Sequence, residues 1–213
     1  MTNAQLYDLI LVKARRAGDS ALRAVIAAEL RGMLNSLERS PFHPWFLETI
    51  SSGVVTVADE ETVVLPSNYL LLVEDAKVYA ISEAGVRTKI TRSYHEDIEE
   101  ANNGLDPGVP SVYDIFANKF YFGPTPDGIY TIRFKYYAAT TPPPDDAEQI
   151  SNPWALDAED FFVVLSAQRL VQNYIKDYNL AGALAAEASG KRVELHKYNE
   201  ARKHVDMDYE VDR

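Results

Sequence analysis

The stretch DSALRAVIAAELRGMLNSLE, residues 19–38, decides the first part of the fold because its apolar residues recur at the period of an α-helix. Asp19 is a residue type that caps a helix N-terminus, and Pro41 ends the pattern. A helix over this stretch would bury one continuous stripe. The stripe consists of Leu22, Val25, Ile26, Leu30, Met33, Leu34 and Leu37.

A shorter helix is predicted before this one. Leu6, Leu9 and Ile10 share one helical face, and Thr2 or Asn3 precedes them as an N-cap. Gly18 separates the two patterns. Two consecutive amphipathic helices with a short connection pack side by side, so we predict an antiparallel helical hairpin over residues 1–50.

The middle of the chain changes to the period of a β-strand. In YTIRFKYY, residues 130–137, apolar and aromatic residues alternate with Thr131, Arg133 and Lys135, which predicts a strand with one buried face. Shorter β-branched and aromatic runs predict three hairpins, formed by residues 53–57 with 62–65, 77–82 with 86–90, and 114–117 with 119–122. We therefore expect a small antiparallel β module over residues 51–149, inserted between helical segments.

Helical patterns return after the stiff, proline-rich linker 142–146. Residues 157–176 are apolar on nearly all sides, which predicts a helix at the centre of the molecule. A last helix starts near Leu180, buries Ala181, Leu184, Ala185 and Ala188, and becomes charged beyond Gly190. We expect C-terminal helices over 150–205 and a flexible tail at 206–213. The predicted class is α+β: a helical bundle built from N- and C-terminal helices, with the β module inserted.

The chain of 213 residues carries a net charge of −11, and the charge is unevenly distributed. Residues 51–150 hold seven Lys/Arg and sixteen Asp/Glu, a net charge of −9. Such a surface disfavours stable binding to the phosphates of nucleic acids. We also expect no signal peptide, because the basic residues follow the first apolar stretch, and no membrane span. Because cysteine is absent, a thiolate metal site and a cysteine nucleophile are excluded.

Two groups of residues are candidates for chemical sites. Residues 93–100, SYHEDIEE, gather His95 and four carboxylates, which predicts a short exposed acidic helix with an acid/base or cation-binding role as the alternative. His196, Glu200 and His204 lie at i, i+4 and i+8. Three such ligands span about 12 Å along a helix, too far to bind one ion together, so we predict a solvated face. We predict no catalytic residue, no metal and no cofactor.

The order of several motifs resembles the head-to-tail adaptor (connector) proteins of tailed bacteriophages, especially the tail tubular protein A type of short-tailed phages. The helical hairpin ends in an aromatic cluster and is followed by a stretch similar to the LPxxYL of that family. The motifs are PFHPWF (41–46), LPSNYLL (65–71), GVPSVY (108–113), FGPTPD (122–127) and the strand 130–137, followed by a long C-terminal helical region.

This resemblance implies a virion structural protein of the head–tail neck, made in the host cytoplasm and without enzymatic activity. It implies a homo-oligomeric ring, a dodecamer in the family, that docks on the portal protein, binds a further tail or nozzle protein and lets DNA pass through its lumen without binding it specifically. Carboxylates that repel DNA would line the lumen, and the candidates are Glu96, Asp97, Glu99 and Glu100. The charged C-terminal segment would dock on the portal through Lys191, Arg192, Leu195, Tyr198, Arg202, Val205, Met207 and Tyr209.

Two other functions stay open from the residues alone. The first is a monomeric protein-binding module whose β insertion recognises a small partner. The second is a tail-associated hydrolase that uses His95 with the acidic 93–100 cluster.

Overall fold

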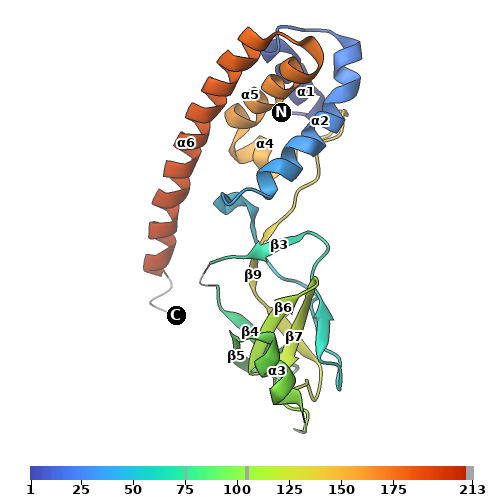
Figure 1. The fold of residues 1–213 in the computed structure, drawn as a ribbon, viewed down its shortest axis with the longest axis vertical. Coiled ribbons are helices and arrows are strands. Elements are labelled where there is room, and N and C mark those ends of the chain that lie inside the picture. Colours follow the sequence, from blue (N-terminus) through green and yellow to red (C-terminus); the bar gives the residue numbers. More distant parts are fainter. Residues whose placement is uncertain (75, 104–105, 210–213) are drawn as a thin grey trace. The chain divides into compact units, whose positions relative to one another are not determined.

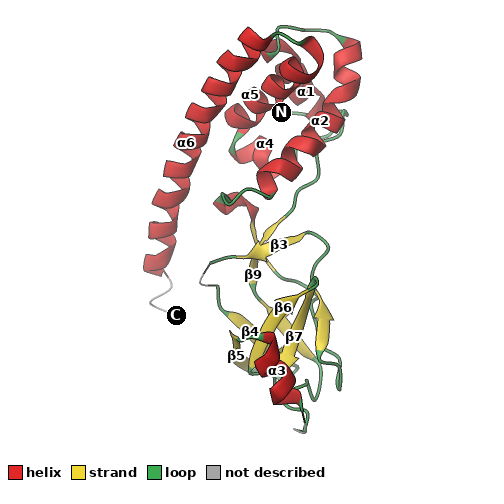
Figure 2. Ribbon diagram, viewed as in Figure 1, coloured by secondary structure: helices red, strands yellow, loops and turns green. Residues whose placement is uncertain are grey.

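The computed structural model divides the chain into two compact units, Met1–Leu47 with Thr140–Arg213, and Glu48–Ala139. It describes residues 1–74, 76–103 and 106–209, the last seven of these by their backbone alone. Figure 1 follows the chain through both units, and Figure 2 shows that helices build the first unit, whereas strands and the helix α3 (His95–Asn102) build the second. The predicted α+β class, with helices at both ends of the chain, is confirmed.

The predicted N-terminal helices are present as α1 (Asn3–Lys13) and α2 (Ser20–Glu38). Thr2 and Asp19 cap them, each with a side-chain oxygen that accepts a hydrogen bond from the first helical turn. The predicted stripe of α2 is buried from Ile26 to Leu37. In α1 the prediction for Leu9 is wrong: this residue is exposed, because the helix buries the adjacent face formed by Leu6, Tyr7, Ile10 and Leu11.

The C-terminal helices are α4 (Pro153–Asp157), α5 (Glu159–Leu170) and α6 (Tyr178–Tyr209). As predicted, α5 is packed on nearly all sides: α1, α2 and α6 contact it, and its residues from Phe161 to Leu170 are buried or half-buried. The predicted helix to residue 176 ends earlier, since the π-helical turn η2 (Val171–Ile175) and a left-handed Lys176 separate α5 from α6. Ala181, Leu184 and Ala188 of α6 are buried, whereas Ala185 faces solvent, so its predicted burial is wrong.

The second unit contains a six-stranded sheet with the order β2-β7-β6-β5-β4-β8. Its strands are β2 (Thr62–Val64), β4 (Val78–Ser82), β5 (Arg87–Arg92), β6 (Val112–Phe116), β7 (Lys119–Gly123) and β8 (Tyr130–Arg133). The hairpins β4–β5 and β6–β7 confirm two of the three predicted ones, and β5 with β6 is the one parallel pair in this sheet. Helix α3 (His95–Asn102) packs on β6 and β7.

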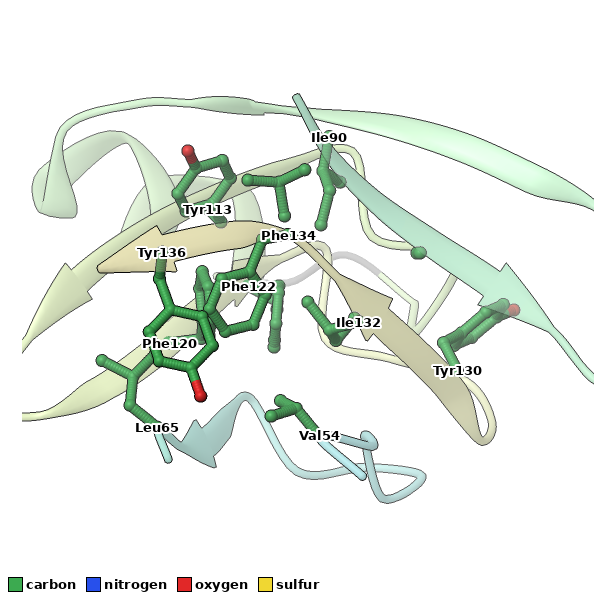
Figure 3. Packing of buried hydrophobic residues seen from close by; sticks show 12 residues of the cluster. Val54, Leu65, Ile90, Tyr113, Phe120, Phe122, Tyr130, Ile132, Phe134 and Tyr136 are labelled. Carbon is green, nitrogen blue, oxygen red and sulfur yellow. The ribbon is translucent and has the colours of Figure 1, made fainter. Parts of the chain in front are cut away.

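The third predicted hairpin, 53–57 with 62–65, is wrong. The backbone of residues 54–56 pairs with β8, whereas β2 pairs with β7 at the other end of the sheet. The turn between them passes through Asp59 in the left-handed region and separates the two segments instead of pairing them. Residues 54–56 therefore extend the six-stranded sheet beyond β8. The sheet and this segment both contribute side chains to the aromatic core that Figure 3 shows.

The predicted strand 130–137 is divided between two sheets. Residues after Phe134 form β9 (Lys135–Ala138), which lies between β1 (Glu48–Ile50) and β3 (Tyr69–Leu72) in a three-stranded sheet. At Phe134 the backbone N–H donates to the hydroxyl oxygen of Ser51, 3.0 Å away, rather than to a strand carbonyl, which interrupts the ladder. The predicted apolar face is confirmed, because Tyr130, Ile132, Phe134 and Tyr136 are all buried.

Candidate docking surface and acidic helix

The aromatic loop, residues 41–46 after α2, contacts the distal part of α6. The backbone N–H of Trp45 donates to Oδ1 of Asn199 at 2.7 Å, and the guanidinium carbon of Arg202 lies 3.6 Å from the centre of the Trp45 ring. His196 meets Phe42 edge to face, with ring centres 5.3 Å apart. Asn199 is only 2% exposed. From the sequence, we expect the segment beyond Gly190 to be charged and to lie outside any local core. It instead packs on the aromatic loop of its own helical unit.

A surface hollow lies where the middle of α6 faces α4 and the start of α5. Its volume is about 470 Å³. Lys191 spans it, with Nζ at 3.0 Å from Oδ2 of Asp160 and 3.9 Å from Oε2 of Glu194, and the hydrogen bond to Asp160 raises the pKa of Lys191. The lining consists of Leu156, Asp157, Ala158, Glu159, Asp160, Phe161, Lys191, Glu194, Leu195 and Tyr198. The lining combines apolar side chains with four carboxylates and one ammonium group, so the hollow carries a net negative charge.

The eight docking residues predicted from the sequence have different surroundings in the structure. Lys191, Leu195 and Tyr198 line the hollow, Arg192 is exposed, and Arg202 stacks on the aromatic loop. The side chains of Val205, Met207 and Tyr209 lie outside the described residues. Sequence reasoning missed the other wall of the hollow, from Leu156 to Phe161, because only folding brings it beside α6.

The four predicted carboxylates of α3 have different surroundings. Oδ2 of Asp97 accepts hydrogen bonds from the Ser93 hydroxyl at 2.7 Å and the Tyr94 N–H at 3.4 Å, so this side chain closes the start of the helix. Glu99 lies 3.6 Å from Nε2 of His95. Glu96 and Glu100 are exposed and have no polar partner among the residues that the structure describes. Two of the four carboxylates are therefore available to something outside the chain.

His95 lies among aromatic rings on the same surface. Its ring centre is 4.7 Å from that of Tyr121 and 5.9 Å from that of Phe116, and its Nδ1 is buried without a hydrogen-bond partner. The described part of the chain contains no group of three side chains placed to hold a metal ion. Of the set His196, Glu200 and His204 on α6, His196 packs on the aromatic loop, Glu200 is exposed, and the side chain of His204 lies outside the described residues.

The class expected from the sequence, the adaptors that join phage heads and tails, is supported by a comparison with protein families. The model of the family described as SU10 adaptor protein matches residues 3–206, nearly the whole chain. The chain belongs to this family of phage head–tail adaptors and is a virion component. A search of curated proteins found no match. None of the helices, over the described range, is long and apolar enough to cross a membrane.

Proposed function

We propose that the chain is a structural adaptor of a phage neck that docks on the portal as a ring and provides the seat for the next tail or nozzle protein. The observation that carries this proposal is the family match over residues 3–206. The resemblance to the tail tubular protein A type supports a ring of twelve copies with a lumen through which DNA leaves the head.

The docking surface is the hollow together with the exposed side of α6 beyond Gly190. Tyr198 is 59% exposed and Leu156 is 58% exposed, so two large apolar side chains stand at the surface beside the carboxylates of Asp157 and Glu159. Tyrosine is a frequent anchor of protein interfaces, since it buries a large area at a small entropic cost. An apolar anchor surrounded by charges is the arrangement expected of a protein contact.

The experiment mixes the purified chain with portal rings from the same genome and examines the product by negative stain and native mass. A collar added to the portal is expected, and the mass counts its copies. Tyr198→Ala should weaken collar formation at least tenfold, the effect of removing one interface anchor. Tyr178→Ala is the matched control, because this tyrosine is 68% exposed on the same helix but outside the hollow. Its binding should equal that of the wild type.

A truncation gives an independent readout. Removing residues 203–213 keeps Asn199 and Arg202 on Trp45, whereas removing 190–213 also takes the acceptor away from the Trp45 N–H. The shorter truncation therefore tests the contribution of Val205, Met207 and Tyr209 with the aromatic loop still covered. Bare portals together with a free monomer of 23.9 kDa would overturn the adaptor proposal and favour the monomeric binding module.

Passage of DNA is supported by the charge of the chain. A net charge of −11 repels phosphates, so DNA is expected to move past the ring without stable contact. In a gel-shift titration at 150 mM salt the assembled ring should leave duplex DNA unshifted. A shift that weakens steeply with salt would contradict this part of the proposal.

A further inference from the structure

A row of basic side chains lies on the outer face of β5, β4 and β8. Tyr79 of β4 is paired with Lys89 of β5 on one side and with Arg133 of β8 on the other. Arg87 lies two residues from Lys89 on the same strand face, because side chains alternate along a strand. The alternate residues Val78, Ala80, Ile90 and Ile132 point into the core. We call Arg87, Lys89 and Arg133 the basic face.

The basic face is unusual for its position in the chain. It occurs within residues 51–150, whose net charge is −9, yet no carboxylate among the described residues lies within salt-bridge distance of its three cations. All three side chains are exposed, and Tyr79 and Ile81 between them are half-buried. Within this unit, then, the three cations of the basic face have no carboxylate partner among the described residues.

The complementary surface is on the same unit, above other strands. Helix α3 covers β6 and β7, as Figure 1 shows, and Glu96 and Glu100 are its two carboxylates without a partner in the described structure. We call them the acidic pair. Ile98 is buried against the sheet, so the acidic pair, at i−2 and i+2 from it, is on the side of the helix directed away from the sheet. Two mostly exposed aromatic residues lie near the start of this helix: Tyr94 is its N-cap, and the ring centre of Phe116 is 5.9 Å from that of His95.

We propose that in the ring the acidic pair of one copy binds the basic face of the next, an inference that rests on the ring of the proposed function. The spacings agree: Glu96 and Glu100 are about 6 Å apart along a helix, and Arg87 and Lys89 are about 7 Å apart along a strand. Both carboxylates can therefore pair at once. The exposed rings of Tyr94 and Phe116 would cover Tyr79 and Ile81, which adds apolar area to the contact.

The contact joins two different surfaces of identical chains. Such a head-to-tail interface propagates and closes into a ring when the rotation between copies divides a full turn. A growing chain of copies has one open acidic pair at one end and one open basic face at the other. Closure of the ring joins these two surfaces. In this arrangement the acidic pair lies at the subunit boundary, which differs from the lumen position predicted from the sequence.

The test uses charge reversal with complementation. Glu96→Lys/Glu100→Lys and Arg87→Glu/Lys89→Glu are each expected to weaken self-association at least tenfold, measured by sedimentation and native mass in 50 mM salt, because like charges would face each other. Mixing the two variants should restore association, since the reversed helix of one then meets the reversed face of the other. Raising the salt to 500 mM should weaken the wild-type association.

Controls separate this contact from folding and from the adaptor role. Arg31→Glu/Arg39→Glu changes the net charge by the same amount as the basic-face variant, on exposed residues of the helical unit, and should associate like the wild type. Circular dichroism checks that every variant is folded. A wild type that stays monomeric at all concentrations, or reversals that leave association unchanged, overturns the interface. If the charge-reversed variants still form normal collars on the portal, the adaptor proposal stands. The acidic pair would then lie away from the subunit boundary, for example in the lumen.

Discussion

Phe134→Ala tests the core of the β unit. Phe134 is 2% exposed, and its ring centre lies 4.9 Å from that of Phe120 and 5.5 Å from that of Tyr136. A buried phenylalanine removes about 150–250 Å² from water, which at about 25 cal/mol per Å² is about 4–6 kcal/mol. Alanine retains the Cβ and its share of this area. We therefore expect a loss of about 3–5 kcal/mol in the free energy of unfolding.

The assay is urea unfolding followed by far-UV circular dichroism, which reports helices and sheets together, and by tryptophan fluorescence. Both tryptophans, Trp45 and Trp154, belong to the helical unit, so their signal shows whether that unit responds to the same substitution. Phe116→Ala is the matched control, because Phe116 is 61% exposed on β6 and its removal should change stability by less than about 0.5 kcal/mol. A loss below about 1 kcal/mol for Phe134→Ala, or equal losses for both variants, would refute the assignment of the buried face.

Three further predictions concern single contacts. Burial raises the pKa of Glu38, so the folded state holds this proton more tightly than the unfolded state. The free energy of unfolding should therefore fall as pH rises from about 4.5 through the raised pKa. Glu38→Gln should flatten that part of the pH–stability curve. Asn199→Ala removes the acceptor of the Trp45 N–H and should lower the free energy of unfolding by about 1–3 kcal/mol in chemical denaturation. Gly123→Ala would place a Cβ 3.0 Å from a side-chain carbon of β6 and 3.3 Å from one of α3, and should lower stability by about 1–3 kcal/mol, seen as a lower Tm.

The helices were predictable from the sequence because their signals are local. The stripe of α2, its Asp19 cap and the apolar surface of α5 are properties of consecutive residues, and tertiary packing agrees with them. The strands were recognisable for the same reason, but their partners were not. Residues 54–56 and β2 are adjacent in sequence, yet they pair with β8 and β7, since packing on the shared core outweighs the local turn.

The candidate surfaces were only partly predictable, because each combines residues that are distant along the chain. Lys191, Leu195 and Tyr198 were named from the sequence as docking residues, but the acidic character of the hollow comes mainly from residues 157–160. The row from Lys89 to Arg133 depends on the register of β5, β4 and β8, which no sequence period specifies. The sequence identified the carboxylates of α3. It did not predict which of them bind groups within the chain and which have no partner among the described residues.

The pairing of β1 with β9 brings the two ends of the β unit together, so the unit can be exchanged as one block, a cassette. Because Glu48 lies opposite Tyr137, the strand that enters the unit and the strand that leaves it are about 5 Å apart, so a connection of a few residues would bridge the excision. The helical unit then becomes a constant frame into which different cassettes can be grafted. In a lineage of adaptors, a new insertion could change what is contacted by the cassette while the helices keep their own packing.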